Sequence, residues 1–267
     1  SDAYNAVGYW DFVTIRGFVL DQVYNFRRDG MPISAETSLP LENKQRIEFL
    51  KGTSGIQAGT SSPGGLVNYV VKRPTNTDLR TLTLETTSYG GLLAHLDMGG
   101  RFGDDQRFGY RLNLVGADIQ SYVPDADGTR SLAALAMDWR VSPDTLIEGE
   151  FELSKRKQPS VPGLSLLGNA LPPADPFINI NSQPWSQANR FENFSGSIGI
   201  VQAINADWRW QGTLASQQLK SNDYLAYPFG CYDAGTDVYY ADRFCPNGDF
   251  DLYDYRSVDE RRKTQSA

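Results

Sequence analysis

Charged side chains occur among apolar neighbours in two parts of this sequence, and their pairing is the first chemistry to explain. Three lie near the N-terminus and three alternate with other residues further along: Arg16, Arg46, Glu48, Glu148, Glu150 and Glu152. A charge that is buried must be paired to offset its desolvation. We therefore expect salt bridges between the N-terminal charges and the three glutamates. The alternative is that Arg16 and Glu48 pair within the N-terminal part.

No catalytic or metal-binding constellation can be assembled from the remaining residues. His95 is the single histidine of the sequence. Residues 125–128 and 249–251 resemble parts of calcium loops but lack the full spacing of ligands. The glycine-rich stretch 52–65 lacks the Gly-Lys-Ser/Thr ending of a phosphate loop. We therefore expect a binding or transport protein and not an enzyme, with no cofactor and no metal site.

Bulk composition narrows the class further. The net charge of −7 argues against a nucleic-acid partner, because phosphate binding requires clustered Lys and Arg. No apolar run reaches the roughly 18 residues that a transmembrane helix needs. The mean hydropathy of −0.43 is still compatible with membrane strands, in which only every second residue is apolar. Cys231 and Cys245 lie close together in a polar segment, which favours a local disulfide formed in an oxidising compartment over two free thiols.

The elements that position these residues fall into two regions. Residues 1–75 have short apolar runs separated by Gly and Pro, which predicts a small α+β unit with tight turns. Within it we expect a short helix over residues 41–49, a hairpin turn at Asp29-Gly30 and a buried strand over residues 66–71. From Leu79 onward apolar and polar residues alternate with period 2, so one face of a sheet is apolar and the other is charged.

The alternating region predicts about eight strands, most of them long enough to cross a membrane at a tilt, which takes roughly 9–11 residues. The expected strands span residues 80–88, 92–102, 107–119, 130–141, 144–156, 192–204, 207–220 and 254–267. Short and long connections alternate between them, as in outer-membrane barrels. Aromatic residues suited to interfacial girdles lie near the strand ends, namely Tyr89, Phe102, Phe108, Trp139, Trp208 and Trp210.

A barrel of about eight strands is filled by its own side chains and has no room for the N-terminal unit. The charged inner face, which includes Arg111 and Arg209, instead implies a wide and wet lumen. The sequence also stops within the last expected strand. We therefore expect this chain to be part of a longer protein.

Four motifs in the N-terminal region carry a family resemblance. They are IRGF at 15–18, DGMP at 29–32, RIEFLKG at 46–52 and PGGLVNYVVKRP at 63–74. In this order and spacing they resemble the plug domain of TonB-dependent outer-membrane receptors, in particular the ferric-siderophore branch. The segment after Glu48 departs from the usual Arg-Gly-Pro and Tyr-Gly pattern, with Lys51-Gly52-Thr53 and Ala58-Gly59 in their place.

The resemblance implies an α+β plug domain over residues 1–75, followed over residues 76–267 by the first antiparallel transmembrane strands of a 22-stranded β-barrel. It implies a place in the bacterial outer membrane, in contact with its lipid, and uptake of a ferric siderophore. It also implies a TonB-type energy-coupling protein, which would bind a segment before Ser1. The alternatives are the same architecture with cobalamin, haem or a glycan as cargo, a passive porin-like channel, a soluble carbohydrate-binding β protein, and a β-propeller enzyme.

In the family, ligand contacts come from the plug apex and the outer loops. By position this implies contacts from Arg16, Tyr24, Phe26, Ser34 and Glu36, and Arg27 and Arg28 near the plug top suit an anionic chelate. Aromatic residues in the long loops suit the rim of an iron chelate, in particular Trp185, Tyr224 and Tyr232. The alternative for each of these residues is a role in a turn or in packing.

Overall fold

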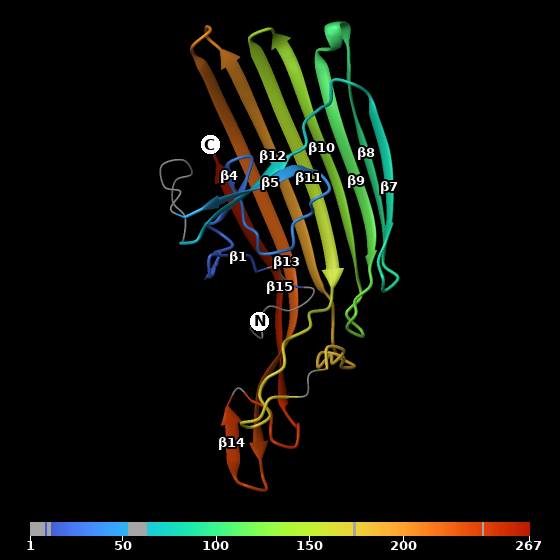
Figure 1. The fold of residues 1–267 in the computed structure, drawn as a ribbon, viewed down its shortest axis with the longest axis vertical. Helices are drawn as coiled ribbons and strands as arrows, with labels where there is room; N and C mark the ends of the chain where they lie inside the picture. Colours follow the sequence, from blue (N-terminus) through green and yellow to red (C-terminus); the bar gives the residue numbers. More distant parts are fainter. Residues whose placement is uncertain (1–8, 10–11, 53–62, 173–174, 242) are drawn as a thin grey trace.

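The computed structural model describes residues 9, 12–52, 63–172, 175–241 and 243–267, with the side chains of 227–229 left aside. Two sheets dominate the described chain, and a small sheet near the N-terminus lies against one face of a much larger one (Figure 1). Within the described ranges, helical structure is limited to the 3-10 turn η1 (Asp104–Gln106). No helix there is long and apolar enough to cross a membrane.

The small sheet has four strands in the order β4-β3-β6-β5. They are β3 (Phe26–Arg28), β4 (Met31–Pro32), β5 (Lys44–Lys51) and β6 (Gly65–Val71). The β3–β4 hairpin turns at Asp29 and Gly30, whose φ angles of 47° and 83° match the two left-handed positions of a type I′ turn. The predicted hairpin turn and the predicted strand over 66–71 are both confirmed.

The helix predicted over residues 41–49 is wrong, because this segment enters strand β5, which pairs antiparallel with β6. The edge of β6 supplies backbone partners that outweigh local helix preference. Gly65 marks how closely the two strands approach, since a Cβ there would lie 2.0 Å from the carbonyl oxygen of Leu50. Only glycine fits at this point of the sheet.

A conventional apolar core holds the small sheet together with the hairpin of β1 (Thr14–Ile15) and β2 (Phe18–Val19). Its members come from the strands and from the loops between them, namely Ile15, Leu20, Phe26, Ile33, Ala35 and Val67. Tyr69 packs against this cluster and stacks on Phe26, with ring centroids 6.5 Å apart. The unit therefore has its own hydrophobic centre.

The large sheet is an antiparallel meander in which nearly every strand pairs with its sequence neighbour. Its strands are β7 (Leu79–Thr86), β8 (Leu92–Phe102), β9 (Phe108–Ile119), β10 (Gly128–Ser142), β11 (Thr145–Gln158), β12 (Asn189–Ala203), β13 (Arg209–Asp233), β14 (Val238–Ala241) and β15 (Asp251–Ser266). Each predicted strand has its counterpart. The long connection expected between the predicted strands 207–220 and 254–267 is partly wrong, because β13 continues to Asp233 and pairs there with β14 and β15.

Burial in the large sheet is inverted relative to an ordinary soluble protein. The face turned away from the small sheet exposes large apolar side chains, among them Leu82, Leu84, Met137, Ile198 and Leu214. The face turned toward the small sheet buries polar ones, among them Asp97, Asn113, Glu150, Glu152, Asn193 and Gln217. An apolar outer band with a polar interior is the arrangement of transmembrane barrel strands. Phe102, Phe108 and Trp139 stack in a row at the short-turn end, as an interfacial girdle requires.

Candidate functional site at the interface between the two sheets

A buried cluster of charges joins the small sheet to the large one. Arg28, at the end of β3, contacts both Glu150 and Glu152 on β11, with 3.0 Å between its Nη2 and Glu152 Oε2. Lys44, at the start of β5, places Nζ 2.7 Å from the same Glu152 oxygen. All four side chains are less than 10% exposed. Two cations and two carboxylates thus offset each other across the interface.

The local fold explains how these groups meet. Residues 150 and 152 are two apart on β11, so both point to the same face of the large sheet. Asn43, just before β5, donates from Nδ2 to Glu152 at 2.6 Å and accepts from Lys44 Nζ at 2.6 Å. Burial lowers the pKa of Lys44, and the attraction of Glu152 counteracts this shift.

Hydrogen bonds extend the interface beyond the charge cluster. The side chain of Gln217 on β13 accepts from the backbone N–H of Ser34 at 2.7 Å and donates to the carbonyl of Ser34 at 3.0 Å. The same amide donates to Asn193 on β12 at 2.9 Å. Because Gln217 satisfies both backbone groups of one loop residue, it fixes that loop in a single position on the large sheet.

Further ion pairs lie around this centre. Glu36 pairs with Arg262 and Glu42 pairs with Arg130. Burial raises the pKa of Glu36, with Arg262 opposing the change. Burial alone would raise the pKa of Glu42 as well, but the hydrogen bond from Arg130 brings it below its ordinary value.

Ion pairs also hold the segment that connects the small sheet to the large one, between β6 and β7. Lys72 places Nζ 2.8 Å from Asp97 on β8, which also receives Arg111. Arg73 pairs with Asp29 at 3.0 Å and lies 3.9 Å from Glu148. The ion pairs and hydrogen bonds of this series tie the two sheets together, and Tyr9 adds a ring contact with Phe191 on β12, with centroids 5.4 Å apart.

Among the residues that the structure describes, two cavities are lined by both sheets. The larger has a volume of about 480 Å³ and lies toward the long-loop end, between residues 37–42 and the inner face of β8–β12. The smaller, about 90 Å³, is lined by polar groups that include Arg28, Glu148 and Gln217. A polar cavity of this size has room for ordered water.

Sequence reasoning located one side of the interface and missed the other. Arg46 and Glu48 bind each other on the exposed side of β5, with 2.8 Å between Arg46 Nε and Glu48 Oε1, which corrects the expectation that they pair with the large sheet. Arg16 lies exposed at the β1–β2 turn. The groups that do reach the glutamates are Arg28 and Lys44. Arg28 directly precedes the Asp29-Gly30 turn, which the sequence predicts. Its place beside a predicted hairpin turn was the sequence signal that could have identified Arg28 as a partner of the glutamates.

Several residues predicted to contact ligand have structural roles. Phe26 is 2% exposed in the apolar core, which corrects its assignment, because a ligand could reach it only by opening that core. Arg27 is also buried and donates to the carbonyls of Tyr24 and Phe26. Ser34 is held by Gln217 and Glu36 by Arg262.

The aromatic candidates have more access to solvent. Tyr24 and Tyr232 are exposed, and Trp185 lies partly exposed in the loop of residues 159–188. Tyr224 is half-buried on β13, where its backbone N–H donates to Asn189. Neither of the two cavities described above is lined by any of these four residues.

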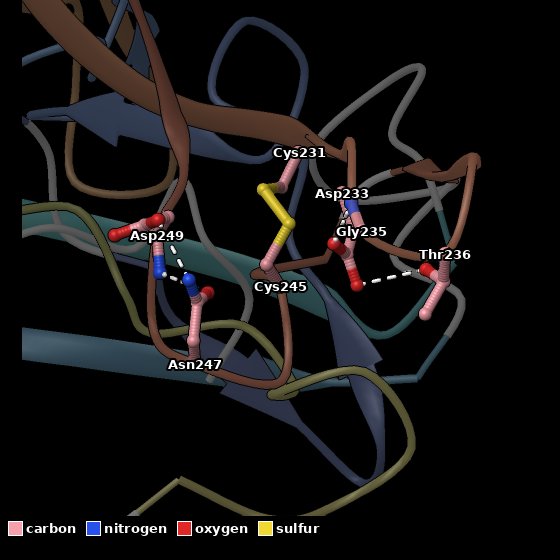
Figure 2. Close-up of a disulfide and its surroundings, with 7 residues drawn as sticks. All are labelled: Cys231, Asp233, Gly235, Thr236, Cys245, Asn247 and Asp249. Carbon is pink, nitrogen blue, oxygen red and sulfur yellow. Dashed lines mark hydrogen bonds between the residues drawn. A yellow bond between two sulfur atoms is a disulfide. The ribbon is translucent and has the colours of Figure 1, made fainter.

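Cys231 and Cys245 form a disulfide, as their spacing predicts, with Cα atoms 5.4 Å apart (Figure 2). Cys231 lies near the far end of β13 and Cys245 in the loop between β14 and β15. Asp233 shapes the turn between them, accepting from the N–H of Gly235 and from the hydroxyl of Thr236.

Comparison with known proteins agrees with this architecture. Residues 3–66 match the family described as TonB-dependent Receptor Plug Domain. The ferrichrome receptor FcuA of Yersinia enterocolitica is 31% identical over 193 residues, which cover 68% of this chain and 25% of the relative. This chain belongs to the TonB-dependent receptors. The small sheet with its hairpin is the receptor's plug, and the large sheet is a section of its barrel wall.

Other relatives of the receptor extend the comparison. The metal-pseudopaline receptor CntO of Pseudomonas aeruginosa is 32% identical over 114 residues, covering 43% of this chain and 16% of the relative. The structure of the pyoverdine receptor FpvA of the same species superposes with a TM-score of 0.76 at 18% identity, covering 97% of this chain and 38% of the other. The chain thus spans 25% of the length of FcuA and 16% of the length of CntO. Like the family it belongs to, it is a protein of the bacterial outer membrane and not an enzyme.

Proposed function

We propose that this chain is part of a receptor that binds a ferric siderophore at the outer surface and imports it into the periplasm, driven from the inner membrane through a TonB-type protein. Residues 1–75 would form the plug and residues 76–267 the first barrel strands. The relatives named for ferrichrome and for ferripyoverdine support this class of cargo. The observation that carries the proposal is the polar plug–wall interface centred on Glu152.

The chemistry of this interface suits a plug that moves. Ion pairs and hydrogen bonds can be exchanged for contacts with water one at a time, whereas an apolar interface would expose hydrophobic surface as it opened. The plug keeps its own core of Phe26, Ile33 and Val67. The plug would therefore shift or rearrange relative to the wall without losing the centre that holds it folded.

Ligand would enter from the long-loop end. The cavity of about 480 Å³ beside residues 37–42 opens toward that end of the wall. Tyr24 on the plug, Trp185 in the loop after β11 and Tyr232 at the far end of β13 are exposed and available to an aromatic chelate. We retain these three as candidate contacts, together with Arg16.

The decisive experiment measures uptake by the full-length receptor. Cells that rely on it for iron should accumulate a radiolabelled ferric siderophore, and collapse of the proton gradient should abolish accumulation while leaving surface binding intact. Uptake that persists without the gradient would show a passive channel. Uptake of cobalamin, haem or a glycan with no binding of ferric chelates would overturn the cargo.

A second cargo has a specific observation in its favour. The metal-pseudopaline receptor is 32% identical over 114 residues, which cover 43% of this chain, so chelates of other transition metals belong in the same assay. Purified full-length receptor should bind one metal chelate at least about tenfold more tightly than the other, a difference of about 1.4 kcal/mol. Calorimetric titration with each chelate measures that preference.

A further inference from the structure

The loop of residues 159–188 and the hairpin at the far end of β13 contact each other backbone to backbone. The N–H of Phe244 donates to the carbonyl of Leu166 at 2.8 Å, and the N–H of Gly168 donates to the carbonyl of Phe244 at 2.8 Å. Leu167 and Phe244 thereby form a parallel bridge. Figure 1 shows this loop running beyond the ends of the strands to lie beside β14. Paired donors and acceptors of this kind hold two segments in a fixed register.

Side chains reinforce the same contact. Arg243 reaches Asn169 with 2.5 Å between Nη1 and Oδ1. Phe244 is 5% exposed and packs against Phe250, with ring centroids 4.7 Å apart. The ring of Phe244 therefore packs within the hairpin, while its backbone hydrogen-bonds to the neighbouring loop.

The disulfide fixes this bridging residue from its other side. Cys245 follows Phe244 directly and is bonded to Cys231 on β13, and both cysteines are buried (Figure 2). The N–H of Cys245 donates to the carbonyl of Asp249 at 2.8 Å, which closes a turn around the bond. The position of Phe244 thus depends on a covalent link to the longest strand of the wall.

The opposite part of the 159–188 loop is tied to a third segment, residues 120–127. Asn179 donates from Nδ2 to the carbonyl of Pro124 at 2.6 Å. Ser182 hydrogen-bonds with Asp125. Gln158, at the end of β11, donates to the carbonyl of Ala126 at 2.8 Å. The 159–188 loop therefore lies between two neighbours and is bound to each.

We propose that three segments form one mechanical unit, the outer loop unit (residues 120–127, 159–172 with 175–188, and 231–241 with 243–250), which the Cys231–Cys245 disulfide holds closed. A loop of this length is costly to order by itself, and the contacts with both neighbours offset that cost. The segments open and close together because each contact is lost when its partner moves. Opening of the hairpin is transmitted through Phe244 to residues 166–168 and onward to residues 120–127.

The test is hydrogen exchange on the full-length receptor with Cys231→Ser/Cys245→Ser. We expect amides of residues 166–168 and 243–250 to exchange at least about tenfold faster, with a smaller acceleration at residues 120–127. Strands β10 and β11 should not change. Acceleration confined to residues 243–250 would overturn the proposal, because the disulfide would then serve its own hairpin alone.

A second variant keeps the disulfide and removes a contact between loops. Asn169→Ala should accelerate exchange at both residues 166–168 and 243–245, whereas the matched control Asn247→Ala, which removes a hydrogen bond to Asp249 inside the hairpin, should leave residues 166–168 unchanged. If the cysteine variant fails to fold, this pair alone decides. Equal exchange in Asn169→Ala and wild type would count against a coupled unit.

Discussion

The plug and the wall bury opposite kinds of residue, although they lie side by side in one chain. The plug gathers Ile15, Phe26 and Val67 into an apolar centre and exposes charged pairs such as Arg46–Glu48. The wall exposes Leu214 and Ile198 and buries Glu152 and its neighbours. In the proposed receptor each face suits its surroundings, because an outer apolar band suits lipid and the plug supplies partners for the inner polar face.

This difference shows where mobility can be tolerated. The plug's fold depends on apolar contacts within itself, while its attachment includes buried ion pairs and hydrogen bonds with the wall. Paired substitutions can therefore weaken one set of contacts and leave the other intact.

The largest effect is expected from Arg28→Met, which leaves Glu150 and Glu152 buried with Lys44 as their remaining cation in the cluster. Removing one member of a buried ion cluster typically costs about 3–5 kcal/mol. Hydrogen exchange of plug amides in the full-length receptor should report this as easier opening of the plug–wall interface. The barrel strands should keep their protection, because their ladder does not depend on Arg28.

Arg46→Met makes the same chemical change on the exposed side of the plug and is the matched comparison. Exposed pairs of this kind contribute about 0–1 kcal/mol, so exchange should be close to wild type. Equally small changes of plug-amide exchange in Arg28→Met and Arg46→Met would mean that water solvates the Arg28 cluster. The contrast between a buried and an exposed ion pair would then be wrong.

The next largest effect is expected on the lipid face. Leu214 is 61% exposed on β13, a few residues from the aromatic Trp210. Leu214→Arg places a charge in the apolar band, where the cost near the midplane is about 2–4 kcal/mol. The folded fraction in lipid vesicles, measured by heat-modifiable migration, should fall. Gln211→Arg adds the same charge on the plug-facing side of the strand and should fold normally, and a loss equal to that of Leu214→Arg would place the lipid face wrongly.

The sequence was most informative where one rule governs many residues. Strict alternation predicted the strands from Leu79 onward, because a sheet with one apolar face and one polar face imposes period 2 on every strand. Local pattern failed at residues 41–49, because a short mixture of polar and apolar residues is compatible with both helix and strand. Pairing with the edge of β6 makes this segment a strand. The sequence pattern also ended β13 too early, because pairing with β14 and β15 extends a strand that local pattern alone would terminate.

The site was harder to predict than the fold for a related reason. Glu150 and Glu152 could be identified because their spacing placed them on the inner face. Their partners Arg28 and Lys44 come from separate strands of the plug, and only the packing of plug on wall selects them over Arg46. Pairing between distant segments is not encoded in local pattern.

A smaller effect is expected from removing one methylene group on each side of the comparison. Ile33→Val trims the plug core, where Ile33 is 6% exposed, and should cost about 0.5–1.5 kcal/mol. Ile198→Val trims the wall's outer face, where Ile198 is 58% exposed, and should have almost no effect on the plug. Hydrogen exchange at β3 and β6 measures the first effect. Equal changes in both variants would mean that plug and wall unfold as one body.

The smallest expected effect is that of pH on the stability of the plug. Glu36 and Glu48 contribute to this pH dependence with opposite signs. Burial raises the pKa of Glu36 against the wall, so its ionisation opposes folding, and this penalty disappears as pH falls through the raised value toward 4.5. Hydrogen bonds from Asn68 and Arg46 lower the pKa of exposed Glu48, so its contribution is present above pH 4.5 and is lost as pH falls through the lowered value.

The glutamine variants isolate these two contributions. As pH falls from 7 to 4, the plug amides of wild type should gain protection relative to those of Glu36→Gln. Over the same range they should lose protection relative to those of Glu48→Gln. Hydrogen exchange, compared at matched intrinsic rates, measures both differences. The slopes differ in sign because one carboxyl faces the wall and the other faces solvent. Parallel slopes would mean that Glu36 is hydrated at the interface, and the plug would then meet the wall across a layer of water at that point.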